Sequence, residues 1–244
     1  MAHLRTAFVF FIISIMMIIL IIPGLLFAVL RVLGLRKPVS IVVYRLAQAW
    51  AKLLIWIAGC KFMVAGRENI PRTGGVCFAS NHGSIVDIPL LLATTGRPAG
   101  FIAKKELSFI PLLNIWILLL GGLFLDRKNV RKAVGTIKTG VRRIENGAAM
   151  IIFPEGHRSR GEGLLPFHQG SFKLATQSGS PIVPVAITGS YETFEKTGLL
   201  QTTHLSITYL PAIVVTDFAV EDRRRAVAEK VRAAIAEELQ KSVH

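Results

Sequence analysis

Hydrophobic positions along the 244-residue chain begin with a long apolar run. Residues 7–30 include no charged side chain, and a helix of that length would be about 36 Å long, enough to cross a hydrocarbon core of about 30 Å. Pro23 and Gly24 interrupt the run, which leaves open a kinked spanning helix or a helix that dips into one leaflet and returns. A cleaved signal peptide fits less well, because the run is long and no small-residue cleavage site follows it.

The segment Ser40–Cys60 is also apolar, but it carries a polar stripe. Arg45, Gln48 and Lys52 are spaced by three and four residues, so a helix would align them on one side. The segment also holds two tryptophans, which favour the membrane interface. We expect an interfacial helix packed back against the first run, with an ordinary core helix of the globular part as the alternative.

From Lys61 onward, short apolar runs alternate with helical stretches. Helices are predicted over Asn129–Ile144 and over Phe218–Leu239, the second capped by Asp217. The predicted strands are Phe62–Val64, Gly75–Ala79, Gly100–Ala103, Leu119–Leu125, Ala148–Phe153, Ile182–Ile187 and Leu205–Leu210. This alternation predicts an α/β fold with a mixed, largely parallel central sheet flanked by helices, over residues 61–244. Residues 1–60 would form a separate membrane-anchoring segment of two helices.

Charge is distributed unevenly along the chain. The net charge is +14, and the first acidic residue, Glu68, follows eight basic residues. Cations among apolar runs suit anionic lipid headgroups, and no nucleic-acid motif accompanies them, so membrane lipids are the expected partner and nucleic acid is not. More cations follow the first apolar run than precede it, which predicts that the rest of the chain lies on the cytoplasmic face of the inner (plasma) membrane.

Two cysteines, Cys60 and Cys77, are too few for a disulfide framework or a structural zinc site. We expect buried thiols in a reducing compartment.

The first candidate for catalysis is the block from Asn81 to Asp87. His82 would follow a strand, at the carboxyl end where α/β sheets hold their sites. Ser84 could cap the next helix, which would place Asp87 in its first turn. A carboxylate on one imidazole nitrogen fixes the tautomer and leaves the other nitrogen as a base for an alcohol proton. On spacing alone, a packed histidine and a capping aspartate explain the block equally well.

A second block, Phe153–Ser159, closes another apolar strand. Glu155 would lie at the edge of the sheet, in a turn where Gly156 can adopt positive φ. Arg158 beside that turn can bind a phosphate with two hydrogen bonds. The alternative is a solvated polar loop.

Two further blocks follow the same pattern. Gly121–Arg127 is a strand that ends in charge, where Arg127 is either a second phosphate ligand or a partner of Asp126. Lys105, after another apolar run, adds positive charge to the same rim. Pro184, inside the apolar run 183–187, indicates a strand end or an edge strand near the site.

These four blocks, at 81–87, 121–127, 153–159 and 183–185, resemble in their order the PlsC-type 1-acylglycerol-3-phosphate acyltransferases. The resemblance covers about residues 60–215 and the ordered set is highly specific. One departure is His157, which stands where the family has threonine; it leaves the reaction class unchanged and the choice of substrate open.

The resemblance implies the site and its substrates. His82 would be the general base and Asp87 its orienting partner. The acceptor, lysophosphatidic acid, would be bound by Lys105, Phe124, Arg127, Glu155, Gly156, Arg158 and Ser159. The donor would be acyl-CoA or acyl-carrier protein, attacked directly at the sn-2 hydroxyl of the acceptor to give phosphatidic acid, without an acyl-enzyme. The sequence agrees with direct attack, because it holds no Gly-x-Ser-x-Gly elbow and no candidate catalytic cysteine. The resemblance implies no metal and no cofactor.

The sequence leaves other interpretations open. A relative of the same family could use another acceptor, such as a lyso-ornithine lipid, or could take its acyl chain from a phospholipid as a transacylase. A membrane-binding protein with a dead site would not need the His82–Asp87 pair. A lipid hydrolase would need a nucleophile elbow.

Overall fold

The structure is a computed structural model that describes residues 2–241. Within them seven strands form one sheet in the order β1-β7-β6-β2-β5-β3-β4. All neighbouring pairs are parallel except β6 and β7, which are antiparallel. The mixed, largely parallel sheet predicted from the sequence is therefore confirmed. The strands are β1 Lys61–Ala65, β2 Val76–Ser80, β3 Ala99–Lys104, β4 Leu123–Leu125, β5 Ala149–Ile152, β6 Ile182–Thr188 and β7 His204–Tyr209.

The central strands are continuous apolar runs because both of their faces are covered. Every residue of β2 and β5 is buried, as expected for a parallel strand between two helical layers. The predicted strand Leu119–Leu125 is shorter than expected. Its first residue ends helix α5, and Gly121, at φ +85°, turns the chain into β4.

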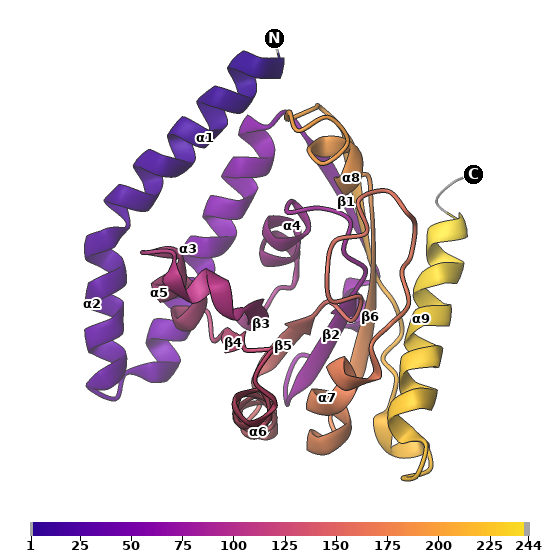
Figure 1. Ribbon diagram of the computed structural model, residues 1–244. Coiled ribbons are helices and arrows are strands. Elements are labelled where there is room, and N and C mark those ends of the chain that lie inside the picture. The colour runs from indigo at the N-terminus through magenta and orange to yellow at the C-terminus, as the bar shows by residue number, and fades with distance from the viewer. Residues whose placement is uncertain (1, 242–244) are drawn as a thin grey trace.

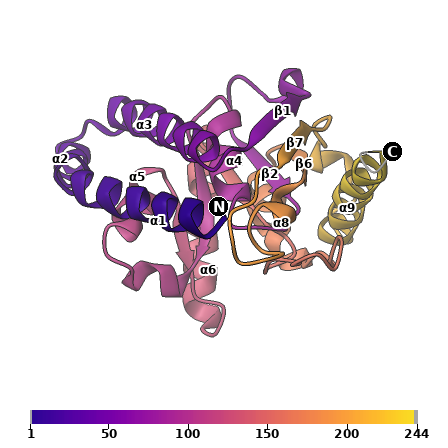
Figure 2. The same ribbon diagram turned by 90° about the horizontal axis from the view of Figure 1, so that it is seen from above.

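The helices lie on both sides of the sheet (Figures 1 and 2). They are α1 Ala2–Ile19, α2 Ile21–Val32, α3 Arg36–Ile57, α4 Asp87–Thr94, α5 Leu113–Leu119, α6 Val130–Glu145, α7 Lys173–Ser178, α8 Ser190–Thr193 and α9 Arg223–Lys241. Short 3₁₀ turns occur at Arg67–Asn69, Lys105–Phe109, Gln169–Phe172 and Val215–Asp217.

Alternate residues of the strands contribute to two separate hydrophobic clusters. Phe78 and Ile151 pack on one face of the sheet with residues of α1, α3 and α4. Cys77 and Met150, their neighbours in sequence, pack on the other face with α6, α7 and α9. The sheet therefore has a buried layer on each side.

Two further details of the sequence prediction are wrong. Asp217 does not cap α9, which begins at Arg223, because Phe218 continues as extended backbone and packs against the second cluster. Pro184 does not mark an edge strand, since β6 lies between β7 and β2. The proline is tolerated because it stands just before the first β6–β7 residue pair, where its carbonyl still accepts a hydrogen bond from the Leu210 N–H at 2.9 Å.

The N-terminal apolar run forms two helices that are bent by 44° between residues 2–16 and α2. The break lies at Leu20, and Pro23 falls in the first turn of α2, where its missing N–H costs no helical bond. By length and composition, α3 alone and the bent α1–α2 pair together are apolar enough to cross a membrane.

Helix α3 packs against α2 on one side and against the sheet on the other. Val39 and Val43 share a cluster with residues of α2, and Ala51 and Ile55 belong to the cluster on the sheet. The expected packing against the first run is confirmed. From the polar stripe of α3, Gln48 donates a hydrogen bond to the Ala93 carbonyl of α4 at 3.1 Å, so this helix also has the character of a core helix.

Candidate active site

The polar side chains singled out in the sequence follow four parallel strands. His82 comes after β2, Glu155 after β5, Lys105 after β3 and Arg127 after β4. These strands are consecutive neighbours in the sheet, so their carboxyl ends meet at one edge. The sheet topology alone brings residues from three of the four sequence blocks together.

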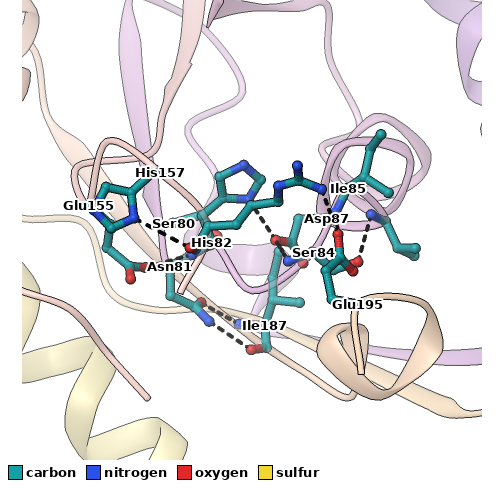
Figure 3. Close-up of polar contacts among 12 residues, drawn as sticks. Ser80, Asn81, His82, Ser84, Ile85, Asp87, Glu155, His157, Ile187 and Glu195 are labelled. Atoms are coloured by element: carbon teal, nitrogen blue, oxygen red, sulfur yellow. Dashed lines mark hydrogen bonds and ion pairs between the residues drawn. The ribbon is translucent and has the colours of Figure 1, made fainter. Parts of the chain in front are cut away.

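His82 and Asp87 form a close pair at this edge (Figure 3). Nδ1 of His82 lies 2.8 Å from Oδ2 of Asp87, which also accepts the Ser84 N–H at 2.9 Å. Asp87 is fully buried, and the His82 ring is stacked on Phe153 with ring centroids 4.0 Å apart. Because the carboxylate accepts a hydrogen bond from Nδ1–H, the proton of the neutral ring stays on Nδ1, and Nε2 is the unprotonated nitrogen that can act as a base.

The turn that carries this pair is fixed by backbone contacts. The Asn81 amide donates to the Ile187 carbonyl at 2.9 Å and accepts the Ile187 N–H at 2.8 Å, which ties the turn to β6. Asp87 lies in the first turn of α4, as expected. Ser84 accepts the Val86 N–H at 3.0 Å, so it supports the turn ahead of the helix, although the N-cap position itself belongs to Val86.

Glu155 holds the loop that follows β5 against this turn. Its Oε1 accepts the His82 N–H at 2.7 Å and its Oε2 accepts the Leu165 N–H at 3.1 Å. Burial raises the pKa of Glu155, while these two hydrogen bonds act in the opposite direction. Ser159 is buried in the same loop, and its N–H donates to the His82 carbonyl at 2.8 Å. Both residues thus contact the backbone of the histidine.

Two arginines, Arg127 and Arg158, line a cavity that His82 also lines. Arg127 donates to the Gly156 carbonyl at 2.6 Å, and Gly156 has the expected positive φ, +79°. Nη1 of Arg158 lies 2.7 Å from Oε1 of Glu195, a residue just after α8. Both guanidinium groups are held through Nη1 in these contacts, which leaves other N–H groups available to an anion.

Glu195 is a member of the site that the sequence reasoning missed. Its side chain is 6% exposed, and Oε1 accepts both Arg158 and the Ile85 N–H, the latter at 2.8 Å. Glu195 lies in a stretch without a motif, 110 residues after the turn it supports, so no local pattern could have indicated it.

Lys105 and Phe124 are not part of the cavity wall that holds the histidine. Lys105 pairs with Asp126 at 2.8 Å; the contact raises the pKa of Lys105 and lowers the pKa of Asp126. Asp126 also accepts hydrogen bonds from the N–H groups of residues 128 and 129. Its partners are therefore Lys105 and the backbone, not Arg127. Phe124 is half-buried in β4, where its carbonyl accepts the Thr136 hydroxyl.

A cavity of about 1310 Å³ opens at this edge of the sheet. His82, Arg127, Gly156, His157 and Arg158 contribute to its wall, whereas Lys105, Phe124, Glu155 and Ser159 do not. Most of the remaining lining is apolar, and α1, α3, α4, α5 and α6 all contribute to it. A long apolar substrate segment can therefore lie beside the imidazole.

Other chemistry-bearing groups of residues 2–241 are the possible metal ligands and the two cysteines. That range holds no cluster of three or more His, Cys, Asp or Glu side chains able to bind a metal. Both cysteines are free and buried, and burial raises the pKa of Cys77 to about 12, so this thiol stays protonated near neutral pH.

The family model described as acyltransferase matches residues 61–188, slightly more than half of the chain. The chain belongs to the acyltransferase family. Its match contains the blocks with His82, Arg127 and Arg158, and the family resemblance seen in the sequence is confirmed.

Curated relatives and solved structures resemble this acyltransferase. A 1-acyl-sn-glycerol-3-phosphate acyltransferase of Borreliella burgdorferi is 34% identical over 149 residues, 61% of this chain and 60% of that one. Another, of Limnanthes douglasii, is 36% identical over 173 residues, 69% of this chain and 60% of that one. The match thus spans about 60% of the length of these relatives.

The crystal structure of the 1-acyl-sn-glycerophosphate (LPA) acyltransferase PlsC from Thermotoga maritima covers 98% of both chains, with a TM-score of 0.79 and 28% identity. The likeness therefore extends over the N-terminal helices as well as the sheet.

Proposed function

We propose that this acyltransferase moves a fatty acyl chain from a thioester to the sn-2 hydroxyl of 1-acylglycerol-3-phosphate, which yields phosphatidic acid. The observation that carries the proposal is the His82–Asp87 pair, 2.8 Å apart, at the wall of a large apolar cavity. The names of the relatives and of the Thermotoga maritima structure support this acceptor.

The proposed chemistry needs one base and no covalent intermediate on the enzyme. Nε2 of His82 removes the hydroxyl proton as the oxygen attacks the thioester carbonyl, and the new C–O bond forms. The C–S bond then breaks, and the imidazolium returns the proton to the leaving thiolate. Asp87 stabilises the imidazolium through Nδ1 and prevents the ring from turning.

Arg158 and Arg127 would bind the phosphate of the acceptor. Both contribute to the cavity wall next to His82, and a guanidinium can bind a phosphate through two parallel N–H groups. Glu155, Gly156 and Ser159 would shape this subsite through the backbone. Lys105 and Phe124 would act at its periphery.

We also propose that α1 and α2 anchor the protein in a membrane, with the sheet on the cytoplasmic side. These helices expose large apolar side chains to the surroundings; for example, Leu4 and Ile22 are each 77% exposed. An exposed apolar surface of this kind is typical of a membrane contact. The cations that follow the first apolar run support the orientation.

The test is an acyl-transfer assay with the protein in detergent, lysophosphatidic acid, and labelled acyl-CoA or acyl-carrier protein, with analysis of the lipid product. We expect phosphatidic acid from the wild type and a loss of about 100-fold to 10,000-fold in His82→Ala. His204→Ala, which changes an exposed histidine of β7, is the matched control.

Lyso-ornithine lipid as acceptor and a labelled phospholipid as donor belong in the same assay. Faster transfer to the first, or from the second, would replace the proposed reaction with one of the alternatives. Full activity of a folded His82→Ala protein would overturn the mechanism.

A further inference from the structure

Three groups must meet at His82 if the proposed function is correct: the acceptor headgroup, the acyl chain, and the thiol with the group that carries it. The apolar part of the cavity between α1, α3 and α5 suits an acyl chain. Arg127 and Arg158 suit the acceptor phosphate. Residues of α6 and of the neighbouring segment 168–177 line the same cavity as well, and neither of these two ligands requires them.

A single face of α6 contributes to the cavity wall. Val130, Ala133, Val134, Ile137 and Lys138 line the cavity at the spacing of three and four residues that aligns side chains on a helix. Val130 is 76% exposed and Val134 is 42% exposed, although the same helix buries Val141 and Ile144 in the core. Two exposed valines that open into a cavity indicate a contact with an apolar part of a ligand.

The segment 168–177 lines the cavity from His168 to Gln177. It supplies Ser171 and Lys173, and α7 packs closely on α6 where Gly140 faces Leu174. Lys138 and Lys173 take part in no ion pair within residues 2–241. Glu106 is the one acidic residue that the described part of the chain contributes to the whole cavity wall. This part of the cavity therefore combines an apolar wall with uncompensated positive charge.

From this geometry we infer that the part of the cavity lined by α6 and residues 168–177 binds the 4′-phosphopantetheine arm of the acyl donor. The inference rests on the proposed function, because it assigns the donor of that reaction to a subsite. The arm has apolar methyl and methylene groups for Val130 and Val134, amide groups for Ser171 and Gln177, and a phosphate for Lys138 and Lys173. The thiol end then lies toward His82, where the C–S bond breaks.

The experiment uses two small donors that differ only in the phosphate: an acyl-4′-phosphopantetheine and the corresponding acyl-pantetheine. Steady-state rates are measured on the full-length protein in detergent with lysophosphatidic acid, and the KM of each substrate is determined. The test variant is Lys138→Glu combined with Lys173→Glu. The control is Lys132→Glu, which reverses one charge on α6 at a position outside the cavity wall, as Lys138→Glu does inside it.

In the wild type the phosphate should lower the donor KM, because two cations attract it. In the double variant the donor KM for acyl-4′-phosphopantetheine should rise about tenfold, equivalent to roughly 1.4 kcal/mol, since reversed charges now repel the phosphate. The KM of acyl-pantetheine and the KM of lysophosphatidic acid should change less than twofold. Acyl-CoA and acyl-carrier protein should both show the loss, because both contain the arm.

A double variant that behaves like Lys132→Glu with every donor would overturn the assignment, and so would an equal rise for the donor with and without phosphate. A loss confined to acyl-carrier protein, or to acyl-CoA, would place the lysines against the rest of that carrier and would also overturn it. If instead the wild type forms no phosphatidic acid from any of these donors, the proposed function itself fails.

Discussion

At the scale of single residues, the site depends on one carboxylate oxygen. Oδ2 of Asp87 contacts both the His82 ring and the Ser84 N–H, whereas Oδ1 is buried without a hydrogen-bond partner in residues 2–241. Burial of a carboxylate oxygen without a hydrogen bond reduces the stability of the fold. This cost is compensated by function where the charge of the carboxylate stabilises an imidazolium.

Asp87→Asn tests this use of charge. The amide has nearly the same shape, but it cannot stabilise an imidazolium and it can favour the wrong histidine tautomer, so kcat should fall by about 100-fold to 10,000-fold. Thermal unfolding should show that the protein still folds. Asp222→Asn, which removes an exposed partner of Arg225, is the control and should keep wild-type kcat. An active Asp87→Asn enzyme would contradict the role of the pair.

Glu195→Gln tests whether the missed glutamate positions Arg158. A glutamine retains one acceptor oxygen but removes the charge, so it cannot bind both Arg158 and the Ile85 N–H as strongly. The KM for lysophosphatidic acid should rise about tenfold, the effect of losing one charge-assisted hydrogen bond, while the donor KM stays near the wild-type value. The exposed neighbour Glu192→Gln should change neither constant. Equal rises in both KM values would show a general structural defect instead.

At the scale of elements, glycines set how closely the strands approach. A Cβ atom on Gly100 in β3 would lie 2.2 Å from the carbonyl oxygen of Gly121, which is backbone and cannot move aside cheaply. Gly135 is the opposite case, because a Cβ there, in the exposed middle of α6, would meet nothing within 4 Å.

This contrast predicts opposite effects of the same substitution. Gly135→Ala should stabilise the protein by up to about 1 kcal/mol, the difference in helix propensity between the two residues. Gly100→Ala should destabilise it by about 1–3 kcal/mol or more, since β3 must shift away from the turn before β4. Denaturant unfolding of both variants measures the free energies. A Gly100→Ala protein as stable as the wild type would show that the close approach is not rigid.

The sequence predicts the elements with strong patterns and misses what depends on distant contacts. Seven apolar runs indicate the seven strands, and the central strands β2 and β5 are continuous apolar runs because both of their faces are buried. The sequence predicts the start of β4 too early, at Leu119, because one apolar stretch contains both the end of α5 and the whole of β4. The sequence block Phe153–Ser159 indicates Arg158 as a site residue. No local pattern indicates its partner Glu195, because only the folded chain brings the two together.

At the scale of the whole molecule, the N-terminal helices differ in how much of their side-chain surface is buried in the core. The sequence places a domain boundary near residue 60, and this division stays a prediction. Val43 and Ile55 of α3 are almost fully buried, whereas α2 has one buried residue, Gly24. Burial of a valine or isoleucine stabilises a fold by about 1.5–3 kcal/mol, a large part of a total stability of about 5–15 kcal/mol.

Two truncations should therefore behave differently. A protein that begins at residue 34 retains α3 and should unfold cooperatively, but should bind vesicles less tightly than the full chain because α1 and α2 are gone. A protein that begins at residue 61 should lose cooperative unfolding. Circular dichroism during heating and flotation with anionic and neutral vesicles measure both properties. Undiminished flotation of the first truncation at high salt would contradict the anchoring role of α1 and α2.

The bent arm formed by α1 and α2 is attached to the rest of the protein near both ends. Arg5 donates to the Thr202 hydroxyl and the Leu200 carbonyl, and Arg31 donates to the carbonyls of Leu118 and Leu119 at 2.9 and 2.7 Å. Between these attachments α1 lines the cavity. If this arm lies in a bilayer, an acceptor reaches the histidine sideways from the lipid phase. Turnover should then follow the mole fraction of acceptor in mixed vesicles and should not change when the same vesicles are diluted in buffer while the enzyme remains bound.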